Sequence, residues 1–134
     1  DGSEVDAING HLTGTFADPH ELKNWQEALQ VDSENLPLIN ATKSLIGHTL
    51  GAAGGIEAVA CLTQIDKKFI HGSLNCDDLH EKILPFERSV VHETREFPGL
   101  KILAKASFGF GDVNSCLIFK SWNGNSVRLK GEKR

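Results

Sequence analysis

The stretch that decides the fold is Thr42–Ala58, TKSLIGHTLGAAGGIEA, together with the apolar residues that follow it. From Leu50 to Ile65 the sequence is apolar almost all round, which predicts a buried helix rather than an amphipathic surface helix. The first turns, Gly51–Gly55, contain three glycines, each costing roughly 1 kcal/mol of helix propensity against alanine. Such a cost is tolerated where small residues let another backbone approach closely. We therefore expect a glycine/alanine-rich helix buried in an α/β domain.

The sequence upstream of this helix predicts a strand followed by another helix. Residues 4–9, EVDAIN, alternate apolar and polar side chains and favour a short strand. Asp18, Pro19 and Glu21 stand in the order of an N-cap, a first-turn proline and a capping-box glutamate, so a helix should begin there. Residues 11–16 are then the loop between the two elements.

The downstream sequence predicts a β-hairpin. Leu100–Ser107 and Asn114–Trp122 are apolar runs on either side of a glycine-rich turn, Phe108–Asp112. Residues 123–134 are polar and basic, which is typical of a frayed tail. We expect one domain over residues 1–122 and a polar tail after it.

Composition excludes several functional classes. The chain has 134 residues and a net charge of −4, which argues against nucleic acid as a partner because that needs a basic face. No apolar run reaches the roughly 18 residues of a membrane span. The chain begins with Asp1 and contains no methionine, so we expect it to be a piece of a longer protein.

The cysteines point to a reducing compartment. Cys61, Cys76 and Cys116 are odd in number and lack CxxC spacing, so neither a disulfide framework nor a metal site is expected. A cytoplasmic location is the default for such a chain. Cys61 lies inside the apolar helix and Cys116 inside a strand, so both are interpreted as small core residues.

Two histidines are candidates for acid–base or oxyanion chemistry. His11 follows a strand in NGHLTGT, and His48 precedes the glycine-rich helix, whose dipole favours a neutral imidazole. The alternative is that both are structural histidines. Lys43 and Glu57 lie beside apolar sequence and are expected to pair if both are buried, the alternative being an exposed loop lysine.

The glycine-rich runs do not match nucleotide-binding motifs. Gly51–Gly55 is not followed by Gly-Lys-Ser/Thr, and Phe108–Asn114 fits GxGxxG in no register. A phosphate-cradling loop is therefore not expected.

Three segments together resemble the β-ketoacyl-[acyl-carrier-protein] synthases of the elongating type. KSLIGHTLGAAGGIEA (residues 43–58) resembles their lysine–histidine segment, NGHLTGT (9–15) their histidine loop, and SFGFGDVN (107–114) their final turn. The resemblance covers roughly residues 4 to 121. It implies the C-terminal half of a thiolase-like α/β fold, with a mixed sheet around the buried helix.

The resemblance also implies roles for the polar residues. His11 and His48 would stabilise the thioester enolate formed when malonyl-carrier protein is decarboxylated, as preorganised donors do. Lys43 would orient and polarise the site, and Glu57 would support Lys43.

The remaining site residues implied by the resemblance contact the substrate arm. Thr13 and Thr15 match threonines that hydrogen-bond the phosphopantetheine of acyl carrier protein. Phe108 matches the gating phenylalanine, whose backbone N–H contributes to the oxyanion hole, and Gly109 and Gly111 would let that loop move. No further cofactor is expected, because the carrier's phosphopantetheine brings the substrates.

The nucleophile of the resembling family is absent. It is a cysteine in the N-terminal half, at a tight turn into a helix, and no cysteine here has that setting. The chain alone is therefore expected to be inactive. We expect it to pair with the missing N-terminal half, within a homodimer or a ketosynthase heterodimer. In the family, a strand and a helix of this half come before the position of Asp1. Without them we expect the strand near Glu4 to lack a neighbour and the apolar helix to lack part of its cover.

Two departures keep other readings open. Leu12 replaces a glycine beside the first histidine, and Asp112 replaces a glycine of the final turn. Both favour a non-catalytic partner of the chain-length-factor kind, whereas the retained histidines and Lys43 favour the enzyme. A degradative thiolase relative would need a C-x-G motif, which Cys116 does not provide.

Overall fold

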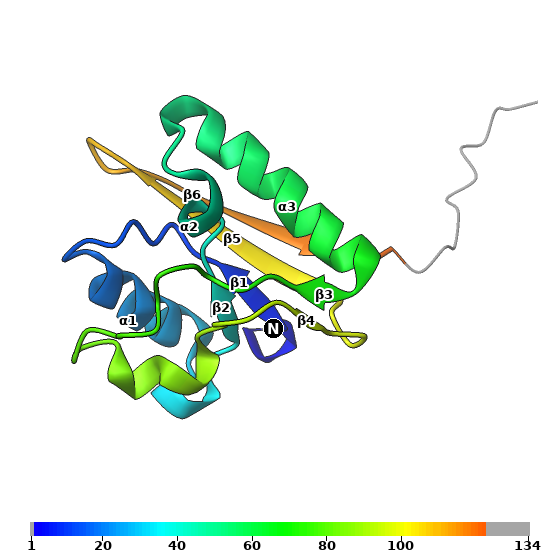
Figure 1. Cartoon of the computed structure of the whole chain (residues 1–134), viewed down its shortest axis with the longest axis horizontal. Helices are drawn as coiled ribbons and strands as arrows, with labels where there is room; N and C mark the ends of the chain where they lie inside the picture. Colours follow the sequence, from blue (N-terminus) through cyan, green and yellow to red (C-terminus); the bar gives the residue numbers. More distant parts are fainter. Residues whose placement is uncertain (1, 123–134) are drawn as a thin grey trace, which may run out of the picture.

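A computed structural model describes residues 2–122 (Figure 1). Its centre is a four-stranded sheet with strand order β2-β1-β5-β6. The strands are β1 (Ala7–Asn9), β2 (Leu38–Asn40), β5 (Ile102–Gly109) and β6 (Val113–Lys120). The first three are parallel to one another and β6 is antiparallel to β5, so the sheet is mixed, as expected. The predicted hairpin is confirmed as β5 and β6.

The strand predicted near Glu4 does not lack a neighbour, and that expectation is wrong. The strand begins at Ala7, after a 3-10 turn over Gly2–Glu4, and is paired on both sides. On one side Ala7 lies opposite Leu38, and on the other it lies opposite Leu103. In the described chain β6 forms one edge of the sheet. β2, at the other end, still carries an isolated bridge between Ile39 and Val90.

The helices and short elements fill the space around the sheet. The helices are α1 (Asp18–Leu29), α2 (Lys43–Ile46) and α3 (Ala53–Lys67), and 3-10 turns cover Ser33–Asn35, Leu50–Ala52 and Leu84–Ser89. Two short strands, β3 (Phe69–Ile70) and β4 (Arg95–Glu96), form a separate antiparallel pair. The strand predicted from Phe69 therefore has only two residues, and the helix predicted from Leu50 begins with a 3-10 turn.

Alternation along the strands separates two cores. Ile8 and Ala104 pack in the cluster that includes Leu22 and Trp25 of α1. Their strand neighbours Ala7 and Leu103 pack in the cluster that includes Cys61 and Ile65 of α3. Because successive side chains of a strand point to opposite faces, α1 and α3 cover opposite faces of the sheet. Figure 1 shows α3 running along β5 and β6.

Helix α3 is buried on its sheet side only. Glu57, Cys61 and Gln64 on that side are each 0% exposed. On its other side Val59 is 64% and Leu62 is 52% exposed, so an apolar face remains uncovered in the described chain.

The face of β6 is uncovered in the same way. Cys116 on this strand is exposed, so its interpretation as a core residue is wrong, whereas that of Cys61 is confirmed. None of the helices within residues 2–122 is both long and apolar enough to cross a bilayer. The predicted polar tail, 123–134, lies outside the described residues.

Candidate active site

The loop that carries His11 is held by two carboxylates of α1. Glu21 accepts the backbone N–H of His11 at 2.7 Å and that of Leu12 at 2.9 Å, one on each carboxylate oxygen. Asp18 accepts the N–H of Thr13 at 3.1 Å and of Gly14 at 3.0 Å. The helix starts where the sequence predicts, but its N-cap is Ala17 with no side-chain cap bond. The two acids therefore order the histidine loop instead of capping the helix.

Glu21 is a buried carboxylate among apolar neighbours. Burial raises its pKa, and the hydrogen bonds from Leu12, His11 and Trp25 oppose that rise. Because all these donors favour the ionised form, the loop is bound most firmly when Glu21 is charged.

Three aromatic rings meet at the ends of three different segments. The ring centroid of His11 lies 5.3 Å from that of His48 and 5.6 Å from that of Phe108, in edge-on arrangements. The sequence places these residues 37 and 97 positions from His11, so only the fold brings them together. The two histidines and Phe108, which the sequence analysis grouped by resemblance, therefore lie close together in the fold.

The backbone around His48 selects its tautomer. Nδ1 of His48 accepts the backbone N–H of Leu50 at 3.1 Å. A neutral ring that accepts at Nδ1 carries its proton on Nε2, so Nε2 is left as a hydrogen-bond donor. Leu50 has a φ of 51°, a left-handed conformation unusual for leucine, in the turn that aims this N–H at the ring.

His11 is held towards the neutral state. Burial is the main cause that lowers its pKa, and the positive charges of Lys43 and Lys105 and the nearby His48 act in the same direction, with Glu57 opposing them. Its Nδ1 is buried and has no hydrogen-bond partner within the described chain. A neutral imidazole can donate one hydrogen bond without carrying a positive charge.

The predicted pair of Lys43 and Glu57 is confirmed. The ammonium nitrogen of Lys43 lies 2.5 Å from Oε1 of Glu57, and the two side chains are 4% and 0% exposed. The reading of Lys43 as an exposed loop lysine is therefore excluded. The second oxygen of Glu57 lies 2.6 Å from the ammonium of Lys105, a residue that the sequence analysis did not single out.

The sequence analysis also missed a buried network of polar side chains at the ends of β1 and β2. The amide of Asn9 donates to the side chains of Asn40 at 2.9 Å and Thr42 at 2.8 Å. Asn40 in turn donates to Gln64 of α3 at 2.8 Å, and Thr42 contacts Nε2 of His71 at 2.9 Å. These bonds tie the ends of β1 and β2 to α3. The available signal was an asparagine closing each of two short apolar runs.

The two threonines line a cleft of about 820 Å³ that also reaches Lys43 and His48. The hydroxyls of Thr13 and Thr15 lie 3.1 Å apart. Leu12 lines the same cleft, so the side chain that replaces the family's glycine does border this space.

Phe108 lies on the other side of the site. It lines a second, smaller cavity with residues of α1 and β6 and does not border the cleft. The hairpin turn beyond it requires positive φ at Gly111 (78°) and at Asp112 (60°). A glycine at 112 would adopt this conformation without strain, which gives a physical reason for the glycine that the resemblance implies at this position. At Gly109 an added Cβ would meet the carbonyl oxygen of Val113 at 3.2 Å.

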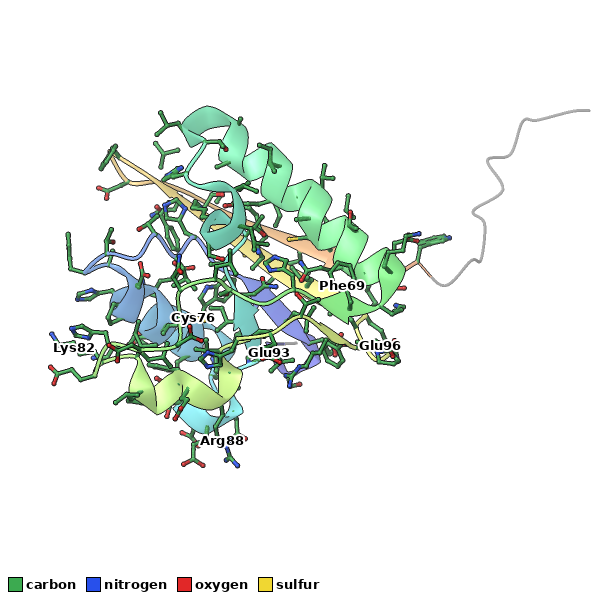
Figure 2. The ribbon with its side chains drawn as sticks, viewed as in Figure 1. Phe69, Cys76, Lys82, Arg88, Glu93 and Glu96 are labelled. Carbon is green, nitrogen blue, oxygen red and sulfur yellow. The ribbon has the colours of Figure 1, made fainter. Side chains whose placement is uncertain are left out.

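The cysteines of this chain are poor nucleophiles. Burial raises the pKa of Cys61 to about 12 and also raises the pKa of Cys76 and of Cys116. Cys76 lies 3.4 Å from Nδ1 of His92 at the surface, in the segment that also carries Lys82 (Figure 2). Since the thiolate is the reactive form, none of the three has an activating environment. No cluster of metal-binding side chains is found among residues 2–122.

The fold and the site together define a class of protein, the ketosynthases of thiolase-like fold. The family profile for the β-ketoacyl synthase C-terminal domain matches residues 1–77, and the chain belongs to this family. It corresponds to part of the C-terminal half of such a synthase.

Sequence relatives match this chain over most of its length. The chain is 40% identical over 120 residues to 3-oxoacyl-[acyl-carrier-protein] synthase 1 of Haemophilus influenzae, covering 90% of this chain and 29% of that protein. It is 38% identical over 120 residues to the chloroplastic 3-oxoacyl-[acyl-carrier-protein] synthase I of Arabidopsis thaliana, covering 89% of this chain and 24% of that protein. Among solved structures, the ishigamide ketosynthase/chain length factor matches with a TM-score of 0.81 and 28% identity, covering 91% of this chain and 29% of that one. The chain thus spans less than a third of these relatives.

Proposed function

We propose that this chain is the C-terminal portion of a synthase that elongates acyl chains by decarboxylative Claisen condensation with malonyl-acyl carrier protein. The condensation is an acyltransferase reaction, and its pathway would be fatty-acid or polyketide-like biosynthesis. The observation that carries the proposal is the meeting of His11, His48 and Phe108, with His48 presenting Nε2–H as a donor.

In the proposed reaction the two histidines act as hydrogen-bond donors to one oxygen. The bond between C2 of the malonyl group and its carboxylate breaks, and CO₂ leaves. The electron pair moves towards the thioester carbonyl, so negative charge develops on that oxygen. Neutral imidazoles at His11 and His48 stabilise this enolate without first giving up a proton. The buried ammonium of Lys43 adds positive charge beside them.

The carbon–carbon bond then forms at the same site, with the acyl group supplied by the N-terminal half of the assembled enzyme. C2 of the enolate attacks the acyl thioester on the nucleophilic cysteine of the N-terminal half, and that cysteine leaves as a thiolate. Phe108 and its backbone N–H, with Gly109, would gate the site and support the oxyanion formed in this step. The high thiol pKa of Cys61 supports placing the nucleophile outside this chain.

The partners follow from this chemistry. Acyl carrier protein delivers both substrates on its phosphopantetheine arm, and the names of the curated relatives include that carrier. Thr13 and Thr15 would hydrogen-bond the arm in the cleft. The N-terminal half would cover the apolar face of α3, and the complete protein would be a homodimer or a ketosynthase heterodimer.

The decisive experiment compares single histidine variants in the assembled enzyme. His11→Ala and His48→Ala should each abolish malonyl decarboxylation and leave acyl transfer to the cysteine largely intact. The reason is that the enolate charge develops during decarboxylation and not during acyl transfer. The surface variant His92→Ala is the matched control, since His92 is exposed and does not line the cleft. Full decarboxylation by both variants would refute the proposed roles. The chain alone, incubated with acyl- and malonyl-carrier protein, should give no ketoacyl product.

A second candidate function is a non-catalytic partner of the chain-length-factor kind. Leu12 in the cleft and the left-handed Asp112 near the gate favour it. The residue at the nucleophile position of the N-terminal half distinguishes the two: cysteine supports the enzyme, and another residue supports the partner subunit.

A further inference from the structure

A second lysine is buried beside the pair of Lys43 and Glu57. Lys105 lies on β5, one residue after Ala104, and its side chain is 1% exposed. Strand alternation turns it to the face that carries α3, since Leu103 packs in the same cluster as Cys61 of that helix. In the register of the sheet it lies opposite Asn9.

Lys105 makes specific contacts in this position. Its ammonium lies 2.6 Å from Oε2 of Glu57, an ion pair without hydrogen-bond alignment. Its protons go instead to the carbonyl oxygen of Ala106 at 2.7 Å and to the hydroxyl of Ser107. Each oxygen of Glu57 is therefore occupied by a different ammonium group, Lys43 from α2 and Lys105 from β5.

The charges in this cluster do not balance. Two ammonium groups face one carboxylate, which leaves one positive charge in excess. Burying an ammonium costs desolvation free energy, and Lys43 by itself already neutralises Glu57. A requirement for stability alone would favour an apolar residue at position 105. We therefore infer that the excess positive charge serves the chemistry of the site rather than the stability of the fold.

The excess charge acts on His11. The rings of His48 and Phe108 contact this ring, and the charges of Lys43 on α2, Glu57 on α3 and Lys105 on β5 act on it. Burial is the largest cause that lowers the pKa of His11. Lys43 and His48 lower it further, Glu57 raises it, and Lys105 lowers it by the smallest amount. On α1, Glu21 reaches the backbone N–H of His11.

We propose that Lys105 is a positioning residue, which holds the second oxygen of Glu57 and adds a buried positive charge that favours an anion beside His11. This inference rests on the proposed function for the identity of the anion, the enolate oxygen. The contact between Lys105 and Glu57 and its effect on His11 belong to the chain alone.

The test is a titration of the histidine ring protons by NMR in the full 134-residue chain, with His11 assigned through His11→Gln. Lys105→Met should fold and should raise the pKa of His11, because a cation is lost. Lys105→Arg should leave it near the wild-type value, and so should the control Lys101→Met, an exposed lysine just before the same strand. An unchanged His11 titration in folded Lys105→Met overturns the proposal. Failure of Lys105→Met to fold also overturns it, because the remaining pair is balanced and Lys105 would then be structural.

A second readout uses the assembled enzyme. Lys105→Met should lower kcat for malonyl decarboxylation by about ten- to a hundredfold, by analogy with the loss when an outer-shell partner of a metal ligand is removed, with KM unchanged. Lys105→Arg should restore most of the rate. If the wild-type enzyme showed no malonyl decarboxylation, the proposed function would be refuted. The NMR titration of His11 would still test the role of Lys105. An equal fall of kcat in the Lys101→Met control would count against a specific role.

Discussion

Glu57→Gln should be the most destabilising single substitution in the polar interior of this chain. The side chain of Glu57 is 0% exposed, and within residues 2–122 no other anion is paired with the two ammonium groups that it contacts, whose side chains are 4% and 1% exposed. Removing one partner of a buried ion pair costs about 3–5 kcal/mol, because the other charge is stranded. The amide would strand two charges, so a loss of at least about 3 kcal/mol is expected, out of the roughly 5–15 kcal/mol that stabilise a domain.

Urea unfolding followed by the fluorescence of Trp25, which is 8% exposed in the core, measures this loss. At about 1–3 kcal/mol per molar urea, the midpoint should fall by roughly 1–3 M. Lys43→Met and Lys105→Met should each cost less, because either leaves a one-to-one pair. Glu34→Gln is the matched control, since Glu34 is 74% exposed and 3.9 Å from Arg88, and it should match the wild type. A loss below about 1 kcal/mol for Glu57→Gln, with an unchanged slope, would refute the reasoning.

Three further outcomes test other parts of the structure. Burial lowers the pKa of His71, so folding favours its neutral form; the resulting stability is full above its unfolded pKa and is lost as pH falls through the folded value. Thermal melts of His71→Gln between pH 7.5 and pH 5 should therefore show a flatter profile than the wild type, and an equal slope would contradict this. Cys61, with its pKa near 12, should resist iodoacetamide until the chain unfolds, whereas exposed Cys116 should be alkylated in the native state, as mass spectrometry of labelled peptides would show. Val59→Lys on the uncovered face of α3 should reduce self-association in sedimentation velocity without lowering the unfolding midpoint; unchanged association would mean that this face is not the contact.

Local sequence patterns were sufficient for the parts of the fold that depend on neighbouring residues. The glycine-rich start of α3, the proline in the first turn of α1 and the hairpin of β5 and β6 are all read correctly, because propensities and turn geometry act over a few residues. The pairing of Lys43 with Glu57 was one of two readings of the sequence, the other being an exposed loop lysine. A buried ammonium needs a carboxylate, and the fold shows that Lys43 is buried against Glu57.

The roles of Asp18 and Glu21 could not be read in this way. Their spacing is that of a helix cap, yet their carboxylates bind the backbone of a loop up to ten residues earlier. The choice between the two sets of donors depends on how the loop folds back over α1, which no local pattern contains. The same limit applies to α3. Its composition is that of a buried helix, but the described chain supplies a cover for only one of its sides.

The candidate residues for the chemistry can be named from the sequence alone: two histidines, a lysine with its carboxylate, and a phenylalanine beside glycines. Their arrangement and their other contacts come from the fold. The pairing of β1 with β5 sets Ala7 opposite Leu103 and so turns Lys105 towards Glu57. A shift of one residue in this register would turn Lys105 to the other face, since side chains alternate along a strand. The register is set by burial of both faces of the sheet at β1 and the middle of β5, strands that are about a hundred residues apart in the sequence. For that reason the second lysine of the site is invisible in the sequence and evident in the fold.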